Sequence, residues 1–362
     1  MGRPGPPGRA LATGGGRSVT RTENWHIYTG TGQPCADVDL RTNLPEPPPW
    51  RTFGGGPALP LPEGDEHDNS RRIGAPDADS SYPAGRHEID MVNAALLLRR
   101  PLLVTGGPGT GKTSLAYRVA RELNLGPVLR WPITSNTKLR QDGLYEYDAI
   151  GRVHASSAKA SGMTDEPTDI GDFVHLGPLG TALLPYELPR VLVIDEIDKA
   201  DLSLPNDLLA VLEDGEYLVR ELARIARRTP KVTVHTADPG GSAQVVEGRV
   251  VCQAFPFIVF TSNREREFPP AFLRRTLQLE MQPPNEEQLA SMIAAHFRDV
   301  SGNSADLIQK FLRRSESEGG LAIDQLLNTV QLATSGKLDT DRASWRRLRD
   351  ALWHRLSTTG FE

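Results

Sequence analysis

Residues 102–113 read LLVTGGPGTGKT, and this stretch decides the fold of the chain. The apolar run 102–104 predicts a buried strand, residues 106–113 fit the pattern G-x-x-x-x-G-K-[ST], and residues 114–123 continue in a helical pattern. Glycines let backbone N–H groups turn toward an anion without Cβ clashes. The following helix points the positive end of its dipole at the same place. This order predicts a phosphate-binding loop rather than a glycine-rich turn that binds nothing.

The loop also predicts how a nucleoside triphosphate is held. Lys112 can reach the β- and γ-phosphate oxygens, and the Thr113 hydroxyl can ligate Mg²⁺. The residues expected at the nucleotide are Gly106, Gly107, Pro108, Gly109, Thr110, Gly111, Lys112, Thr113 and Ser114.

A second strand signal carries two acids at its end. Residues 191–194 are continuously apolar, as expected for a strand covered on both faces, and Asp195 and Glu196 follow. Parallel sheets bind ligands at the carboxyl ends of their strands. We expect Asp195 to hold Mg²⁺ and Glu196 to polarise the attacking water. The plain alternative is an exposed acidic turn, but the phosphate loop upstream favours the catalytic interpretation.

A third strand, residues 257–261, ends in Ser262 and Asn263. A polar side chain at this tip can contact both the γ-phosphate and the attacking water. The following segment, 270–275, predicts a short helix that ends in Arg274 and Arg275.

Composition narrows the class of protein. The chain has 362 residues, a formal charge of −5, and apolar and charged fractions of 38% and 24%, which permit a sizeable core. No apolar run approaches the ~20 residues that span a bilayer. The two cysteines give no disulfide framework, and no His/Cys cluster has zinc spacing. These features predict a cytoplasmic protein.

The sequence predicts three parts. Residues 1–80 form a Pro/Gly-rich, partly disordered N-terminal extension, residues 81–282 an α/β domain, and residues 283–362 a small helical lid with four helical patterns. Aromatic residues such as Trp25 and Tyr28 indicate that the extension either lies across the α/β domain or docks a partner.

Two inserts interrupt the α/β domain. The segment at about 151–175 is poor in apolar residues, and the segment at about 231–252 predicts a β-hairpin whose turn contains Asp238-Pro239-Gly240-Gly241. Both are long and polar at their tips, so we expect them to be dispensable for the core and to face the centre or rim of an assembly.

With these motifs in order, residues 82–357 resemble AAA+ ATPases, and within them the MoxR group, which is related to McrB. GGPGTGKT is similar to the Walker A motif, VLVIDEID to Walker B, and Asn263 to sensor 1. FPPAFLRRTLQLE resembles the stretch that carries the arginine finger, with Arg275 the better match and Arg274 the second. The two inserts are similar to the helix-2 insert and the pre-sensor-1 hairpin of the same clade.

The resemblance implies a P-loop NTPase parallel sheet flanked by helices, ATP and Mg²⁺ as cofactors, and catalytic roles for Glu196, Asn263, Arg275 and Arg274. It also implies a homo-oligomer, a hexamer by family expectation. Such proteins remodel or activate partner proteins, often ones with a von Willebrand A domain, or act in bacterial defence modules. One position departs from the family pattern. The third lid helix lacks a sensor 2 arginine and has Asp324 near that place, so either Arg313 or Arg314 substitutes or the lid couples weakly to ATP.

Two other functions stay open. The first is a McrB-like motor of a nucleic-acid-processing or restriction complex, which would need basic and aromatic surfaces. Arg224, Arg227 and Arg228 form one basic cluster, and the arginines around Trp345 and Trp353 form another. The spacing of the second cluster favours a packed lid helix, and the charge of −5 argues against direct nucleic-acid binding. The second is a nucleotide-gated scaffold that hydrolyses ATP slowly.

Overall fold

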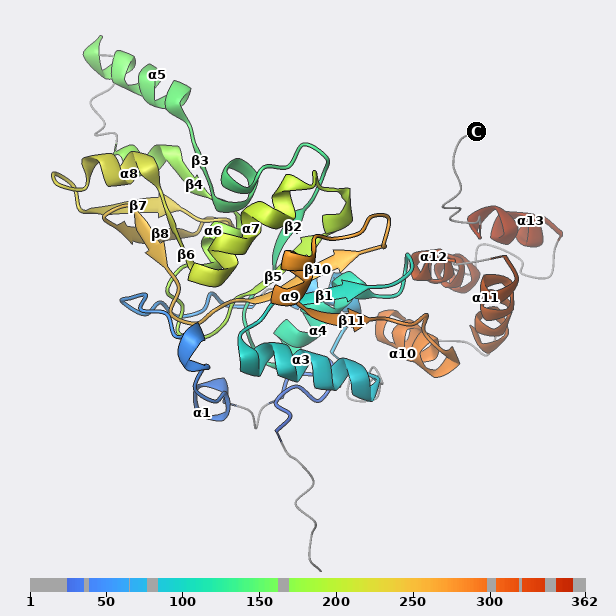
Figure 1. Cartoon of the computed structure of the whole chain (residues 1–362). Coiled ribbons are helices and arrows are strands. Elements are labelled where there is room, and N and C mark those ends of the chain that lie inside the picture. Colours follow the sequence, from blue (N-terminus) through green and yellow to red (C-terminus); the bar gives the residue numbers. More distant parts are fainter. Residues whose placement is uncertain are drawn as a thin grey trace, which may run out of the picture.

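The computed structural model describes residues 25–35, 39–64, 66–76, 84–161, 169–297, 304–318, 321–335 and 343–353. Five strands form a central parallel sheet in the order β11-β1-β10-β5-β2 (Figure 1). Their bounds are β1 Leu102–Thr105, β2 Leu129–Pro132, β5 Val191–Asp195, β10 Phe257–Ser262 and β11 Leu277–Glu280. The phosphate loop, the acid pair and Asn263 follow β1, β5 and β10, so all three lie at the carboxyl edge of this sheet.

Helices cover both faces of the sheet, which explains its apolar strands. Side chains of each strand alternate between two hydrophobic clusters: Phe257 and Val259 join one cluster, and Ile258 and Phe260 join the other. The first face is covered by α3 (Arg86–Leu98) and α4 (Lys112–Glu122), the second by α6 (Pro178–Ala182), α7 (Ser203–Asp214) and α9 (Pro270–Arg275). The predicted α/β fold is confirmed.

A second sheet lies beside the core, on the side away from the lid helices (Figure 1). Its order is β3-β4-β7-β8-β9-β6, with bounds β3 Tyr145–Tyr147, β4 Val174–Leu176, β6 Glu216–Leu218, β7 Lys231–His235, β8 Ser242–Val246 and β9 Arg249–Val251. Strands β7 and β8 form the predicted hairpin. Helices α5 (Ala149–Ala160) and α8 (Arg220–Ile225) flank this sheet, and part of the first insert, residues 162–168, lies outside the described residues.

The hairpin turn is not the free tip that the sequence predicts. The Asp238 carboxylate accepts hydrogen bonds of 2.9 and 2.7 Å from the guanidinium of Arg190, which is fully buried just before β5. Arg190 also donates to the Tyr186 hydroxyl and the Pro127 carbonyl. The turn therefore closes over the amino edge of the central sheet, opposite the phosphate loop, and this contact disfavours the expectation that the core can spare the tip.

Four helices form a separate apolar cluster at the other end of the molecule. They are α10 (Glu286–His296), α11 (Ser304–Glu318), α12 (Ile323–Thr334) and α13 (Ala343–Leu352). Trp345 and Trp353 are 5% and 1% exposed within it, and Trp353 Nε1 donates to Thr329 Oγ1. The arginine-rich stretch is therefore a packed helix, as its spacing predicts. Its first arginine, Arg342, lies outside the described residues.

The described part of the extension packs on the α/β domain. Ile27 and Tyr28 are buried in the cluster under α3 and α4, and their backbone N–H groups donate to Asn93 Oδ1. Three short helices follow: α1 (Leu40–Asn43), η1 (Pro49–Arg51) and α2 (Glu66–Ile73). Of the two alternatives for the extension, these contacts favour packing on its own chain. None of the helices in the described ranges is long and apolar enough to cross a membrane.

Candidate nucleotide site

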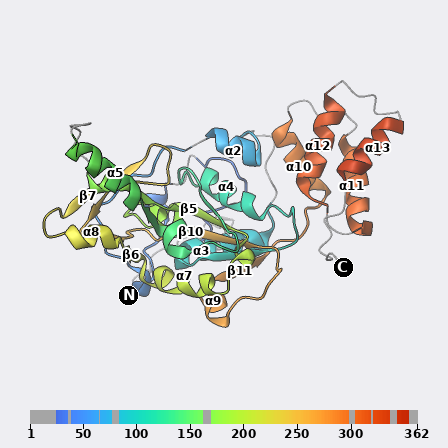
Figure 2. The same ribbon diagram turned by 90° about the horizontal axis from the view of Figure 1, so that it is seen from above.

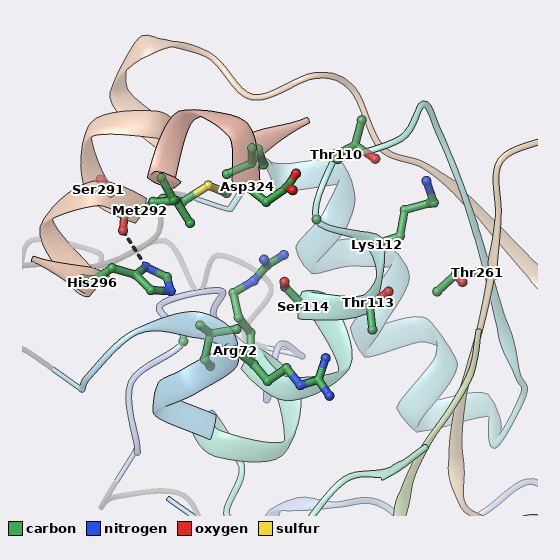
Figure 3. Close-up of a pocket in the computed structure, with 18 of the residues that line it drawn as sticks. Arg72, Thr110, Lys112, Thr113, Ser114, Thr261, Ser291, Met292, His296 and Asp324 are labelled. Atoms are coloured by element: carbon green, nitrogen blue, oxygen red, sulfur yellow. Dashed lines mark hydrogen bonds between the residues drawn. The ribbon is translucent and has the colours of Figure 1, made fainter. Parts of the chain in front are cut away.

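A pocket of about 420 Å³ lies where the α/β domain, the lid and the extension meet (Figure 3). The α/β domain contributes phosphate-loop residues 108–114, Asp195, Glu196, Thr261 and Asn263. The lid contributes residues of α10 and α12, and the extension contributes Thr31, Gly32, Gln33, Arg72, Ile73 and Ala75. The pocket thus joins residues that lie almost 300 positions apart in the chain, from 31 to 327.

The phosphate loop has the geometry that its glycines predict. Gly109 has φ +73°, and a Cβ there would lie 2.7 Å from Ala322 Cα at the start of α12. The loop therefore needs glycine both for its left-handed backbone and for its close approach to the lid. Helix α4 begins at Lys112, so its unpaired N–H groups face the pocket.

Lys112 and Asn263 meet inside the pocket. Lys112 Nζ donates to Asn263 Oδ1 at 2.7 Å and to the carbonyls of Gly106 and Gly107 at 3.0 and 2.7 Å. Burial lowers the pKa of Lys112, and the charges of Asp198, Asp195 and Glu196 oppose this shift. All three acceptors are neutral, so the ammonium can exchange them for phosphate oxygens, which are stronger acceptors.

Asp195 is an ionised carboxylate with three donors. Its Oδ1 accepts from Thr113 at 2.9 Å and from Thr261 at 2.7 Å, and its Oδ2 accepts from Arg130 at 2.7 Å. Burial alone would raise the pKa of Asp195, but the hydrogen bonds from Thr261, Arg130 and Thr113 outweigh it and hold the pKa below its ordinary value.

The donor set suits Mg²⁺. The Thr113 hydroxyl and the Asp195 carboxylate are adjacent hard oxygen ligands, which Mg²⁺ prefers. Within the described ranges there is no cluster of three or more His, Cys, Asp or Glu side chains that could hold a metal. Mg²⁺ usually keeps several waters and binds substrate phosphates, so two protein oxygens are enough to hold it with a nucleotide.

Glu196 lies at the rim of the pocket with a strained backbone. Its φ is +62°, which is uncommon for a residue with a side chain, and its N–H donates to Thr261 Oγ1 at 2.9 Å. Its carboxylate is 44% exposed and pairs with Lys199 at 2.8 Å. An exposed ion pair of this kind is weak, so the carboxylate can turn to a water in the pocket.

Asp198 positions this edge of the site, although no motif of the sequence predicts a role for it. Its Oδ2 accepts the backbone N–H groups of Asn263 at 2.8 Å and Glu265 at 3.1 Å. Thr261, which bridges Asp195 and Glu196, was also missed. A hydroxyl residue in the otherwise apolar run 257–261, two positions before Asn263, is the signal that could have found it.

The predicted arginine finger stands apart from this pocket. Arg275 on α9 is 41% exposed and approaches Glu213 at 3.3 Å, and the Arg274 carbonyl accepts from Arg100. Among the described pocket residues there is neither Arg274 nor Arg275. In the lid, Asp324 lines the pocket, while Arg314 pairs with Asp350 at 3.0 Å.

The extension is held against the pocket by a buried carboxylate. Glu122, the last residue of α4, accepts from the N–H groups of Thr29 and Gly32 and from the hydroxyls of Thr29 and Thr31. These contacts fix the loop that forms the pocket wall at Thr31–Gln33. The sequence showed aromatic residues in this region but no sign that it reaches the nucleotide pocket.

Residues 101–276 match the AAA domain of the dynein-related subfamily. The match takes in the phosphate loop, Asp195, Glu196, Asn263 and Arg275, and it leaves out the extension and the lid helices. Together with the parallel sheet, the match indicates an AAA domain over residues 101–276.

One curated relative is an ATP-dependent protease ATP-binding subunit-like protein from Rhodococcus erythropolis. It is 31% identical over 158 residues, which cover 41% of this chain and 40% of the relative. The chain thus spans about two fifths of the length of that relative. Among solved structures, NtrX from Brucella abortus in complex with ADP matches with 15% identity and a TM-score of 0.38, over 76% of this chain and 56% of that chain.

Proposed function

We propose that the chain binds ATP with Mg²⁺ and hydrolyses it. The observation that supports this proposal is that one pocket holds the Lys112–Asn263 and Thr113–Asp195 hydrogen bonds together with Glu196. Lys112 and Asn263 would hold oxygens of the γ-phosphate, and Glu196 would accept the proton of the attacking water. Mg²⁺ bound at Thr113 and Asp195 would neutralise charge on the phosphates.

The Glu196→Gln variant tests this proposal. It removes only the carboxylate that accepts a proton, so ATP should still bind with an unchanged Kd while turnover falls by a factor on the order of 10²–10⁴. Phosphate release and calorimetric ATP binding, both in the presence of Mg²⁺, measure the two effects. Turnover equal to that of the wild type would remove Glu196 from the mechanism.

We further propose that the active form is a ring in which Arg275 completes the site of the next subunit. Two observations support this: Arg275 is half-exposed on α9, and it does not belong to the described wall of its own pocket. Contacts of this kind are heterologous and close into a ring when the rotation permits. The family resemblance leads us to expect a hexamer. We also propose that the domain boundaries lie at residues 80 and 282.

The biological role that we propose is ATP-driven remodelling or activation of a partner protein, as the resemblance to the MoxR group implies. The Rhodococcus relative is described as an ATP-binding subunit, which fits a protein that works with a partner. A von Willebrand A domain protein is the expected partner. Burial of Trp345 and Trp353 in the lid removes one of the two surfaces that the McrB-like alternative would use, while Arg224, Arg227 and Arg228 stay exposed. ATPase stimulation by the partner protein, compared with stimulation by double-stranded DNA, discriminates the two.

A further inference from the structure

The arginines that line the pocket come from the extension and from α4. They are Arg72 on α2 and Arg118 and Arg121 on α4. The lid residues in the described pocket wall include an acid, Asp324, and no arginine. Asp324 would therefore repel a polyanionic ligand in this pocket. The arginines that could bind such a ligand lie on α2 and α4.

Two of these arginines are engaged in buried contacts. Arg118 pairs with Glu88 at 2.8 Å, and both side chains are less than 10% exposed. Arg121 donates to Glu66 Oε1 at 2.9 Å and to the Gly74 carbonyl at 2.8 Å. Because each of them is matched with a carboxylate, their positive charges are already compensated within the protein.

Arg72 is matched less closely with a carboxylate. It lies 3.7 Å from Asp68, but Arg71 donates to the same carboxylate oxygen at 2.5 Å, so two cations share one anion. The Arg72 guanidinium lies 5.4 Å from the centre of the Tyr117 ring. Its buried Nε, at 3.7 Å from Asp68 Oδ1, makes no hydrogen bond, which is also true of the buried Nε of Arg121. Figure 3 draws Arg72 and Ser114 together in the middle of the pocket. A buried N–H without an acceptor is unfavourable, and a ligand oxygen would satisfy it.

The helix that carries Arg72 is fixed between the core and the lid. Figure 2 shows α2 beside α4 and α10, and it contacts both helices. The Ala75 N–H donates to the Ala295 carbonyl of α10 at 2.9 Å. Gly74 has φ +81°, and a Cβ there would lie 2.5 Å from Ala295 Cβ, so this approach requires glycine. The helix that carries the arginine is thus held in place before any ligand arrives, which reduces the entropy cost of binding.

We propose that Arg72 contacts the phosphate oxygens that ADP and ATP share, and that the N-terminal extension thereby supplies a binding residue of the nucleotide site. This inference rests on the proposed nucleotide binding. A guanidinium has only donors and matches phosphate geometry, so the phosphates are its natural partner rather than the base. Glu196 and Asn263 occupy the end of the pocket assigned to the γ-phosphate, and Arg72 stacks on α4 beyond Ser114. This placement selects the inner phosphates.

The adjacent arginine gives a matched control. Arg71 lies on the same helix, carries the same charge, pairs with the same Asp68 and is 61% exposed. In calorimetry with the full chain, Arg72→Met should raise the Kd of both ADP and ATP by at least about tenfold, since a charge-assisted hydrogen bond is lost. Arg71→Met should bind both nucleotides like the wild type. Arg72→Lys should lie between them, because it keeps the charge without the planar fork.

Adenosine separates a phosphate contact from a structural role. Its ability to displace a fluorescent ADP analogue should be the same in Arg72→Met and wild type, because adenosine has no phosphate. Unchanged ADP and ATP binding in Arg72→Met, or an equal loss of adenosine binding, would overturn the inference. If a thermal melt shows that Arg72→Met does not fold, the binding of ADP, ATP and adenosine is compared between Arg72→Lys and the wild type instead. A wild type and Arg71→Met that both fail to bind nucleotide would instead overturn the proposed function.

Discussion

At the residue scale, the backbone conformation of Glu196 determines where the two acids of the site lie. Its left-handed backbone costs on the order of 1–3 kcal/mol and persists only because the surroundings hold it. The Thr261 hydroxyl accepts its N–H and donates to Asp195, so one side chain fixes both acids. The strain turns the chain sharply at the end of β5, which places Asp195 toward Thr113 and Glu196 toward the pocket rim.

The two cysteines give a prediction at this scale. Cys252 is fully buried, and burial raises the pKa of its thiol to about 12, whereas Cys35 is partly exposed. At pH 8 the reactive thiolate of Cys252 is a fraction on the order of 10⁻⁴. A disulfide reagent at pH 8 should therefore modify Cys35 rapidly in the folded protein and Cys252 only in denaturant.

Mass spectrometry after a short exposure identifies the modified thiol. Cys35→Ser is the control, since it should remove the fast reaction and leave the slow one. Equal reaction of both thiols in the folded protein would contradict the buried position of Cys252.

The site residues differ in how far the sequence could reveal them. Lys112, Thr113, Asp195 and Asn263 belong to motifs or to strand ends, and the structure brings them into one pocket. Asp198 and Arg130 act through tertiary contacts, to the loop after β10 and to Asp195 respectively. Neither contact follows from a local pattern, because each joins two segments that are distant in sequence.

At the element scale, the β7–β8 turn depends on one buried charge pair. Arg190 is 0% exposed and Asp238 is 12% exposed, and removing one partner of a buried pair leaves an uncompensated charge. Asp238→Ala should lower the free energy of unfolding by about 3–5 kcal/mol. The midpoint and slope of urea unfolding measure this change.

An exposed pair in the same sheet is the control. Arg249 and Glu216 are 60% and 32% exposed, so Glu216→Ala should cost no more than about 1 kcal/mol. Equal effects of the two variants would show that Asp238 does not compensate a buried charge.

Element by element, the strongly periodic segments were the predictable ones. The helical pattern after the phosphate loop forms α4, and the segment 270–275 forms α9 with the predicted bounds. The segment 134–147 contains a π-helix, Leu139–Leu144, and β3, and no residue of it belongs to the described pocket wall. Strands of three residues such as β3, β4 and β9 have too short a pattern to be predicted locally.

At the scale of the whole molecule, the pocket lies between parts that the sequence treated separately. The AAA domain match covers residues 101–276, but the pocket also needs the extension and the lid. Hydrogen bonds tie α2 to α10 through Ala75 and to α4 through Gly74. Any movement of the lid relative to the core must therefore be accompanied by a movement or a break at α2.

Assembly gives the last prediction. Each subunit has a phosphate loop, an acid pair and Asn263 in one pocket, and Arg275 stands outside the described wall of that pocket. An arginine supplied by a neighbour accelerates related phosphoryl transfer by about 10³–10⁵-fold. ATPase activity per subunit should therefore rise with protein concentration, and Arg275→Ala should bind ATP normally but hydrolyse it slowly.

Mixing two inactive variants tests whether the arginine acts between subunits. Lys112→Ala should not bind nucleotide but keeps Arg275, whereas Arg275→Ala keeps an intact pocket. At an interface where Arg275 of a Lys112→Ala subunit faces the pocket of an Arg275→Ala subunit, all groups are present, so the mixture should regain part of the activity. Light scattering at each concentration reports the assembly state alongside phosphate release. Equal activity per subunit in dilute monomers and in concentrated protein, with no recovery on mixing, would show that each subunit hydrolyses ATP without its neighbour.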